Sequence, residues 1–302
     1  MTSRRGFLKA AAAVAAAGAG RGASSGMYVS LNGSLTGGRP PWPEFARLAA
    51  RVGFGGVDVN LNAAMKEGLG ATRALFAETK IKASNANLPV PFNASGDAFQ
   101  AGVAKLDEAA RFASAIGCPC LLGIIPPASL TPMAEFRPFF KARVVAVAEV
   151  LRKSNIKLSL EFLGPLHFRT GQPYEFIWRM NDALAFAKEC GSNVGLTLDV
   201  WHWYHAGATR ADIVAAGASR IVHLHLSDCK KLPPEEVRDN QRVLPGEGVI
   251  DLVGFLRTLK QIGYQGGISP EPIGRIPKDM PPEEGARLGL DTALAVMRKA
   301  GV

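Results

Sequence analysis

The chain has 302 residues, of which 47% are hydrophobic and 20% are charged, an ordinary composition for a globular protein. Its length allows one large domain or two modest ones. The formal charge is +9, but four basic residues and no acid lie within positions 1–26, and the remainder carries 31 basic against 26 acidic side chains. So small an excess, without a basic run or a basic helix face, argues against nucleic acid as a partner.

The first predicted element is an export signal over residues 1–26. The stretch SRRGFLK precedes an apolar run rich in Ala and Gly and then ASSG, which offers cleavage near Ala19 or Ala23. The segment resembles a twin-arginine signal, and that resemblance implies export of the folded protein to the periplasm. A membrane anchor needs about 18 strongly apolar residues. This run is shorter and weaker, so we expect no stable membrane anchor.

Residues 27–302 show apolar runs that alternate with amphipathic helical patterns. The predicted strands are 27–32, 56–62, 80–88, 119–125, 157–163, 194–200, 220–228 and 266–272. The helical patterns include 42–53, 99–117, 135–154, 174–191 and 252–263, and most of them end in Gly, a common C-cap. Eight strand–helix units in about 275 residues predict an α/β fold, a single (β/α)8 TIM barrel. The alternative is a doubly wound open sheet, but the expected GxGxxG turn is absent from the sequence.

The four cysteines predict neither a zinc site nor a disulfide framework. They form no C-x-x-C pair, and four are too few to cross-link a chain of this length. We therefore expect Cys118, Cys120, Cys190 and Cys229 to be buried as small hydrophobic side chains.

The last four predicted strands share one alternation of side chains. Within each strand, every second residue is apolar. The residues between them are a small or polar residue and then, two positions later, an ionisable residue. The ionisable residues are Glu161, Asp199, His225 and Glu271. Alternate residues of a barrel strand face the interior, and barrel active sites form at the carboxyl ends of the strands. We therefore expect these four side chains to meet at the barrel mouth.

Three carboxylates and an imidazole at one point predict a divalent cation. Without one, the carboxylates repel and lose hydration, which costs several kcal/mol per uncompensated ion. The oxygen-rich set favours Mn²⁺ or Mg²⁺, with Co²⁺ also compatible. The alternative is four carboxylate and imidazole groups in ordinary hydrogen bonds. His223 points to the same face as His225, one layer deeper, and is expected to fill the barrel.

Four segments resemble the sugar phosphate isomerases and epimerases of the xylose-isomerase-like barrel superfamily. They are LEFLGP, GLTLDVWHW, IVHLHLSD and RVLPGEGVIDLVGFLRTLKQIGYQGGISPEP, and they make the likeness strong over residues 150–275. Over the first half of the chain, the resemblance to this family is limited to the spacing of the predicted strands. The resemblance implies that Glu161, Asp199, His225 and Glu271 hold one divalent metal, most readily Mn²⁺.

The resemblance also implies residues that contact the substrate. Asp199 and His202 match a D-x-x-H pair whose His touches substrate, and Lys231 matches a basic residue, six after the metal-binding His, that grips substrate oxygens. Related ketose epimerases carry a further Glu six residues after the first metal Glu. Here that position is His167, which we expect to contact substrate and which argues against ketose epimerisation of the best-known type.

Other residues near the predicted mouth are candidates on chemical grounds. The segment 229–248 is too long for a plain turn and is predicted to form a lid, in which Lys231 and Arg242 would bind hydroxyl, carboxylate or phosphate groups. Trp201 and Trp203 suit sugar stacking and rim packing equally. Asn85 and Asn87 would bond hydroxyls or serve a turn, and His205 is expected in a surface loop.

Together these assignments predict an enzyme with a small sugar as its partner. It would be a divalent-metal-dependent isomerase or epimerase of a keto- or aldo-sugar, with Glu161 and Glu271 transferring protons through a metal-bound enediolate. Export favours an unphosphorylated or oxidised sugar. The alternative is a dehydratase or lyase on a keto-sugar, keto-glycoside or keto-inositol. A three-zinc apurinic endonuclease of the same superfamily would need histidines in the lid, and residues 229–248 contain none. The intact carboxylates of Glu161 and Glu271 argue against a non-catalytic sugar-binding protein. The sequence leaves open whether the protein forms a homo-oligomer.

Overall fold

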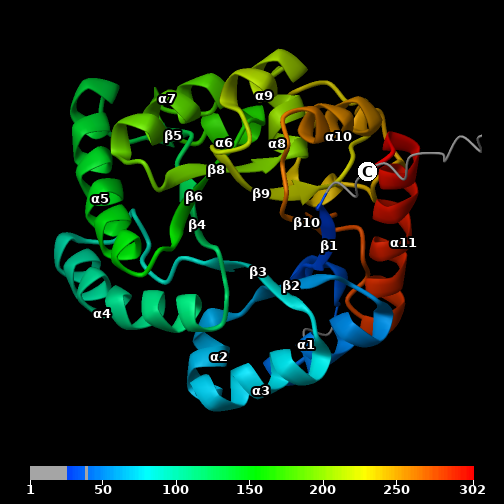
Figure 1. Ribbon diagram of the computed structural model, residues 1–302. Coiled ribbons are helices and arrows are strands. Elements are labelled where there is room, and N and C mark those ends of the chain that lie inside the picture. Colours follow the sequence, from blue (N-terminus) through cyan, green and yellow to red (C-terminus); the bar gives the residue numbers. More distant parts are fainter. Residues whose placement is uncertain (1–25, 38–39) are drawn as a thin grey trace, which may run out of the picture.

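The computed structural model describes residues 26–37 and 40–302. Within these residues, eight parallel strands close into one barrel in the order β1-β10-β9-β8-β6-β4-β3-β2. They are β1 (Tyr28–Leu31), β2 (Gly56–Val59), β3 (Lys82–Asn87), β4 (Cys120–Ile125), β6 (Lys157–Phe162), β8 (Val194–Asp199), β9 (Ile221–Leu226) and β10 (Gly267–Pro270). Figure 1 shows this inner ring with the helices around it. The predicted TIM barrel is confirmed, and each predicted strand supplies one barrel strand.

The helices pack their apolar stripes against the outside of the barrel. They are α1 (Trp42–Val52), α2 (Leu61–Glu67), α3 (Leu69–Thr79), α4 (Gly96–Ala115), α5 (Met133–Lys153), α6 (Leu166–Arg169), α7 (Met180–Cys190), α8 (Val200–His205), α9 (Arg210–Ala216), α10 (Leu252–Gln261) and α11 (Pro282–Ala300), with two 3-10 turns, η1 (Gly33–Leu35) and η2 (Asp239–Gln241). In α1, Phe45, Leu48, Ala49 and Val52 are buried at helical spacing, and Gly53 ends the helix with φ of 103°.

Two predicted elements differ from those observed. The pattern over 174–191 begins as a short strand, because β7 (Tyr174–Glu175) pairs with β5 (Ala128–Ser129) outside the barrel, and α7 starts only at Met180. The strand predicted over 56–62 ends at Val59, because the side chain of Asn60 accepts a hydrogen bond from the amide of Ala63 and starts α2.

The interior of the barrel below the mouth is lined by buried polar side chains that bond to one another. Ser159 and Thr197 share a hydrogen bond of 2.6 Å between their hydroxyls, and Ser30 donates to Ser84 at the same distance. His223 is fully buried, as predicted for a side chain that fills the barrel. These hydrogen-bonded small side chains form a rigid layer beneath the residues at the barrel mouth.

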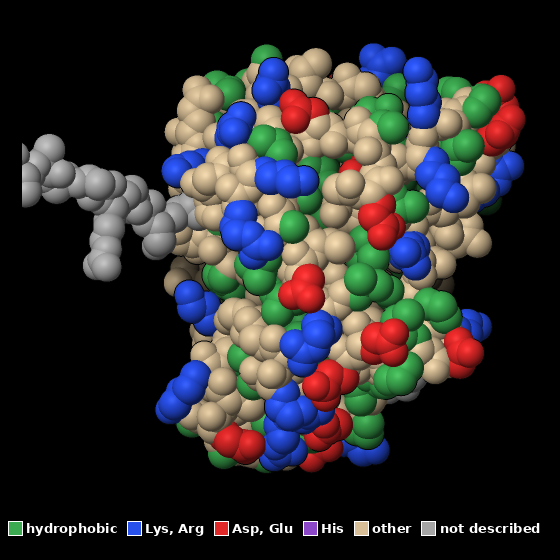
Figure 2. Space-filling model, turned by 90° about the vertical axis from the view of Figure 1, so that its right-hand side faces the viewer, with side chains coloured by type: hydrophobic (Ala, Val, Ile, Leu, Met, Phe, Trp, Pro, Cys, Tyr) green, Lys and Arg blue, Asp and Glu red, His purple; other side chains and the backbone are tan. Residues whose placement is uncertain are grey.

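All four cysteines lie among the described residues, where each is free and buried, as expected. The predicted signal, 1–26, falls outside the described residues except for Gly26. Figure 2 shows the face that carries α11, where basic and acidic side chains are interspersed. Across the described ranges, no helix combines the length and the apolar character needed to cross a membrane.

Candidate metal centre at the barrel mouth

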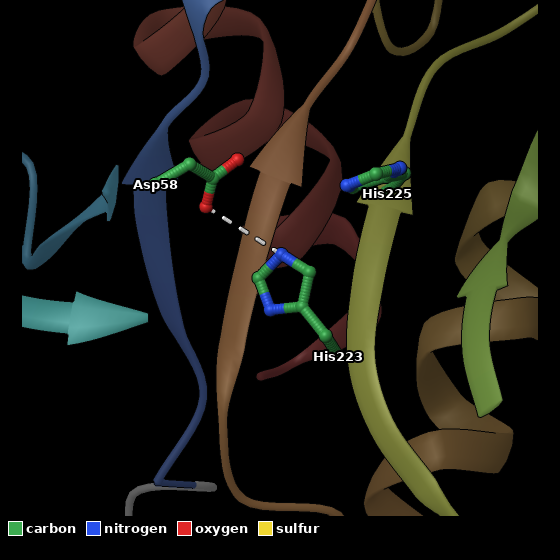
Figure 3. A group of neighbouring side chains, drawn as sticks. All are labelled: Asp58, His223 and His225. Atoms are coloured by element: carbon green, nitrogen blue, oxygen red, sulfur yellow. Dashed lines mark ion pairs between the residues drawn. The ribbon is translucent and has the colours of Figure 1, made fainter. Parts of the chain in front are cut away.

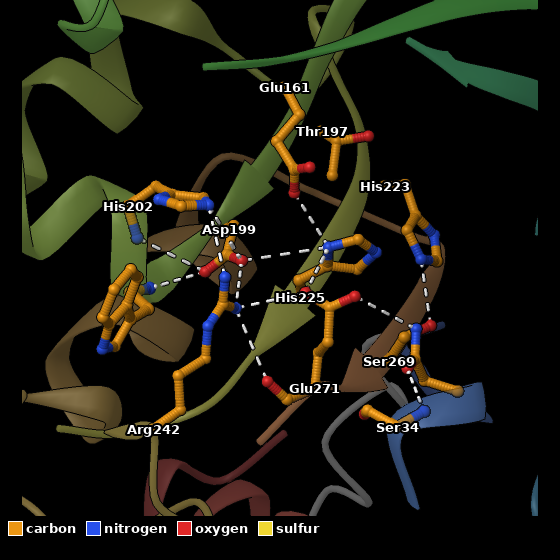
Figure 4. A network of polar contacts seen from close by, with 12 residues as sticks. Ser34, Glu161, Thr197, Asp199, His202, His223, His225, Arg242, Ser269 and Glu271 are labelled. Atoms are coloured by element: carbon orange, nitrogen blue, oxygen red, sulfur yellow. Dashed lines mark hydrogen bonds and ion pairs between the residues drawn. The ribbon is translucent and has the colours of Figure 1, made fainter. Parts of the chain in front are cut away.

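Four ionisable side chains from four neighbouring strands meet at the carboxyl end of the barrel (Figure 4). The register pairs Asp199 with His225, and Glu271 directly follows β10. His225 Nδ1 lies 2.9 Å from Oε1 of Glu161, 3.2 Å from Oε2 of Glu271 and 3.9 Å from Oδ2 of Asp199. The structure therefore brings together the quartet that the alternation of the strands predicted.

The donor atoms of this quartet fit a divalent cation. One atom from each of the four side chains lies within 4.8 Å of the corresponding atoms of the other three. Ligand atoms about 2.1 Å from an ion lie about 3 Å apart when adjacent and about 4.2 Å apart when opposite. Three carboxylates and one neutral imidazole are also ligands that Mn²⁺, Mg²⁺ or Zn²⁺ accepts. Distances and chemistry together make this a candidate site for one divalent metal ion.

Arg242 lies among the same carboxylates. Its Nη1 is 2.6 Å from Oδ2 of Asp199 and 3.1 Å from Oε2 of Glu271, and its Nε and Nη2 both donate to Oδ1 of Asp239. The side chain is 2% exposed. Its donors are thus taken up by carboxylates, so Arg242 holds the loop 229–248 over the quartet. Its predicted role in binding substrate stays a prediction.

Two buried basic side chains, Arg242 and His225, determine the electrostatics of the quartet. Burial alone would raise the pKa of Asp199, but Arg242, His202 and His225 outweigh it and hold that pKa below its usual value. Burial opposes the charged form of His225, yet Glu271 and Glu161 raise its pKa well above the ordinary value. A protonated His225 would compete with a metal ion for the same nitrogen, Nδ1.

Asp199 also positions the helix that follows it. Its Oδ1 accepts from the amide of Trp201 at 2.7 Å and from that of His202 at 3.4 Å, which caps α8. His202 then faces the quartet, with Nε2 3.3 Å from Nη2 of Arg242. Burial lowers the pKa of His202 to about 3, so the ring is neutral and accepts from Arg242. Its Nδ1 is buried and has no partner among the described residues.

Trp201 and two further histidines form the rim beside His202. Trp201 is 1% exposed and packs under the guanidinium of Arg242, 4.6 Å from the ring centre. This burial favours rim packing over sugar stacking. His167, in α6, lies edge-on to Trp201. His205 was expected in a surface loop, and that expectation is wrong: it ends α8, half-buried, with its ring 4.6 Å from that of Trp201.

For the remaining candidates, Lys231, Asn85 and Asn87, the structure gives the surroundings and the exposure. Lys231 is exposed in the loop that follows β9. Asn85 is buried and contacts the thiol of Cys120, whereas Asn87 is exposed at the end of β3. Of the two, only Asn87 is open to a ligand, and a role in substrate binding for Lys231 stays a prediction.

Two residues beside the quartet were not predicted from the sequence. Asn32, after β1, and Asp58, in β2, hydrogen bond to each other at 2.9 Å, and Asn32 Nδ2 also lies 3.5 Å from Oε1 of Glu271. Burial raises the pKa of Asp58 to about 6. The alternation within GVDVNLN, which points Asp58 inward with Gly56, could have indicated it.

Comparison with known proteins defines the family. The model of the family described as xylose isomerase-like TIM barrel matches residues 46–299, so the chain belongs to that family. An inosose isomerase of Halalkalibacterium halodurans is 30% identical over 156 residues, which is 51% of this chain and 52% of that protein. The chain thus matches about half the length of this curated relative.

Solved structures show the same architecture over nearly the whole chain. A xylose isomerase domain protein of Alicyclobacillus acidocaldarius superposes with a TM-score of 0.84 at 27% identity, covering 91% of this chain and 100% of that one. The IOLI protein, solved with a zinc atom, gives a TM-score of 0.76 at 21% identity, covering 91% and 99% of the two chains. At that identity the second likeness shows the fold alone.

Proposed function

We propose that the protein is a divalent-metal-dependent isomerase or epimerase of a keto-sugar, an aldo-sugar or a keto-inositol. The observation that carries the proposal is the convergence of Glu161, Glu271 and His225, with His225 Nδ1 within 3.2 Å of an oxygen of each glutamate. Epimerisation needs a proton acceptor and a proton donor beside one carbon, and isomerisation needs them beside two adjacent carbons. Membership in the xylose isomerase-like family and likeness to an inosose isomerase support this assignment.

The two glutamates approach the mouth from separated strands. Glu161 belongs to β6 and Glu271 follows β10, and β8 and β9 lie between them in the barrel. A bound divalent cation supplies a Lewis acid that polarises a ketone and its neighbouring hydroxyl, which acidifies the C–H between them. One carboxylate then removes that proton. In epimerisation the other glutamate, in its protonated form, gives its own proton to the opposite face of the same carbon, and exchange with solvent restores both groups. In isomerisation a proton is delivered to the neighbouring carbon, and the hydroxyl proton passes to the former ketone oxygen.

The proposed resident ion is Mn²⁺, with Mg²⁺ and Co²⁺ as alternatives. Three carboxylates with one imidazole favour these ions over a thiolate-type zinc site. Zinc belongs in the same test, because the IOLI protein was solved with a zinc atom. Elemental analysis of the purified protein should find about one such ion per chain, lost in the variants Glu161→Ala and His225→Ala. Metal-free protein after reconstitution with all four ions would contradict the metal site.

Activity is tested by exchange with solvent. The metal-loaded protein is incubated in D2O with a panel of keto-sugars, aldo-sugars and inososes, and the products are analysed by mass spectrometry. We expect deuterium at a carbon beside the carbonyl and a product with the mass of an isomer. Loss of water or of a glycosyl group would instead identify a dehydratase or lyase. Absence of exchange with every substrate, in protein that holds its metal, would favour a sugar-binding protein.

We also propose export by the twin-arginine route to the periplasm. The support is the paired arginine in SRRGFLK before a short, weakly apolar run. A periplasmic location would favour unphosphorylated or oxidised sugars. Replacing both arginines by lysine, as Arg4→Lys with Arg5→Lys, should retain the protein in the cytoplasm of a bacterium with this route. Unchanged fractionation of that double variant would contradict the proposal.

A further inference from the structure

Asn32, at the end of β1, connects the candidate metal centre to β2, because β1 lies between β10 and β2 in the barrel. Its Oδ1 accepts from the amide of Ser34 at 2.8 Å, so the amide nitrogen must face the opposite way. There Nδ2 donates to Oδ2 of Asp58 at 2.9 Å and lies 3.5 Å from Oε1 of Glu271. The two hydrogens of one amide group therefore face two carboxylates, one of which belongs to the quartet.

Two side chains deeper in the barrel, Ser269 and His223, hold Asp58 in place. Ser269 donates to Oδ1 of Asp58 at 2.8 Å, and His223 Nε2 lies 3.6 Å from the same oxygen (Figure 3). Because Ser269 has one hydroxyl proton and donates it to Asp58, its 3.0 Å contact with His223 requires Nε2 to be the donor. The chain of contacts from His223 through Ser269 and Asp58 to Asn32 thus begins at a fully buried ring. It leaves Asn32 little freedom to move.

The two oxygens of Glu271 have different surroundings. Oε2 contacts His225 Nδ1 at 3.2 Å and Arg242 Nη1 at 3.1 Å, whereas Oε1 faces Asn32. Glu271 comes one residue after β10 ends, and at 17% its side chain is the most exposed of the quartet. Its orientation consequently depends on side-chain contacts more than on close packing.

We propose that Asn32, braced by Asp58, is a positioning residue that holds Oε1 of Glu271 and so turns Oε2 toward the divalent cation. The inference rests on the proposed metal centre and adds residues from β1 and β2 to the four that would touch the ion. Partners that orient ligands in this way commonly change metal affinity by about 10- to 100-fold when they are removed. Nothing in this role requires Asn32 to touch metal or substrate.

The test variant is Asn32→Ser in the full chain. Serine retains an oxygen that can cap η1 at the amide of Ser34 but is too short to reach Glu271 or Asp58. We expect the dissociation constant for Mn²⁺, measured by titration calorimetry, to rise about 10- to 100-fold. The unfolding midpoint of the metal-free protein should change little. An Mn²⁺ affinity within a factor of about two of the wild type would overturn the inference.

Asn60→Ser is the matched control. Asn60 also caps a helix, through Ala63, but it lies exposed at the start of α2 and makes no contact with the quartet. Its substitution should leave Mn²⁺ affinity unchanged. As a second test, Asp58→Asn should weaken Mn²⁺ binding, and its effect should not add to that of Asn32→Ser, because the two residues act as one unit. Full additivity would contradict the bracing role.

The same titrations separate this inference from the proposed function. If Glu271→Gln weakens Mn²⁺ binding and Asn32→Ser does not, the metal centre stands and the positioning role fails. If the wild-type protein binds no divalent cation at all, the proposed function fails and the positioning role fails with it.

Discussion

Nη1 of Arg242 lies 2.6 Å from Oδ2 of Asp199, so a cation from the loop over the barrel mouth directly contacts a carboxylate of the candidate metal centre. Both side chains are almost wholly buried. Asp199 and Glu271 together raise the pKa of Arg242 further, although burial opposes its charge. In protein without metal, Arg242 therefore neutralises carboxylates that a divalent ion would otherwise neutralise.

Arg242→Met should have opposite effects on stability and on metal binding. Removing one partner of a buried ion pair leaves an uncompensated charge, which costs about 3–5 kcal/mol of metal-free stability. The same change removes a positive charge beside the ligands, so Mn²⁺ should bind at least about tenfold more tightly. Urea unfolding in EDTA and titration calorimetry measure the two effects. Weaker Mn²⁺ binding in this variant would show that Arg242 supports the ligands more than it opposes the ion.

Arg143→Met is the control for the loss of a buried arginine. Arg143 is buried and donates to the carbonyl oxygens of Phe92 and Ala94, with no carboxylate among its hydrogen-bond partners in the described ranges. This variant should lose stability and keep the Mn²⁺ affinity of the wild type.

Glu161→Gln and Glu271→Gln should each keep the fold and lose turnover. The amide has the shape of the carboxylate but cannot accept a proton, and acid–base groups contribute about 10²- to 10⁴-fold to rates. We therefore expect kcat to fall at least about 10²-fold on whichever substrate shows exchange in D2O. Glu247→Gln is the control, because Glu247 pairs with Arg275 at the surface. Near wild-type turnover of either quartet variant would remove that glutamate from the mechanism.

The part of the site that follows strand alternation could be predicted from the sequence. Glu161, Asp199, His225 and Glu271 sit at or just after the ends of regular strands, where a period of two fixes the direction of the side chain. His205 was placed wrongly because Asp199 caps α8 directly, so a helix begins where a loop was expected.

Contacts that depend on irregular backbone could not be predicted in this way. Arg242 reaches the quartet from the loop 229–248, which has no period from which its direction could be inferred. Between β2 and β3 the register shifts at Val57 and Asp58, so alternation along one strand does not give the neighbours of Asp58 on the next. The contact between Asn32 and Glu271 joins the ends of the first and last strands, β1 and β10, which pair only because the barrel closes.

Gly164→Ala should disturb the helix that carries His202. A Cβ at Gly164 would collide with the carbonyl oxygen of His202 and lie 2.8 Å from the amide nitrogen of Ala206. Both are backbone atoms of the turn that ends α8, so they cannot rotate away as a side chain could. We expect a loss of about 1–3 kcal/mol in unfolding free energy, typical of overpacking.

Gly70→Ala is the control for that substitution. Gly70 lies in α3 with open space where a Cβ would be, so Ala should stabilise the protein by about 0.5–1 kcal/mol through helix propensity. Urea unfolding measures both variants. A stable Gly164→Ala variant would mean that α8 can move away from the loop after β6.

His205→Phe should make the protein less sensitive to acid. Burial lowers the pKa of His205 to about 4, against about 6.5 in an unfolded chain, and Arg242 adds to the effect while Asp199 opposes it. Between these two values the unfolded state binds a proton that the native state does not. Stability therefore falls as the pH drops through this window and levels off near pH 4. Phenylalanine keeps a ring against Trp201 and removes the titrating group.

Unfolding free energies at pH 7 and pH 4.5, measured in EDTA so that no metal contributes, give the comparison. Because His205 is only half-buried, solvent screening reduces its share, and we expect the variant to lose about 1–2 kcal/mol less than the wild type over this interval. Tyr204→Phe alters the same helix without a group that titrates below pH 7 and should follow the wild type. If His205→Phe follows it as well, His205 must be protonated in the native state at pH 4.5, and the burial of its ring would not govern its charge.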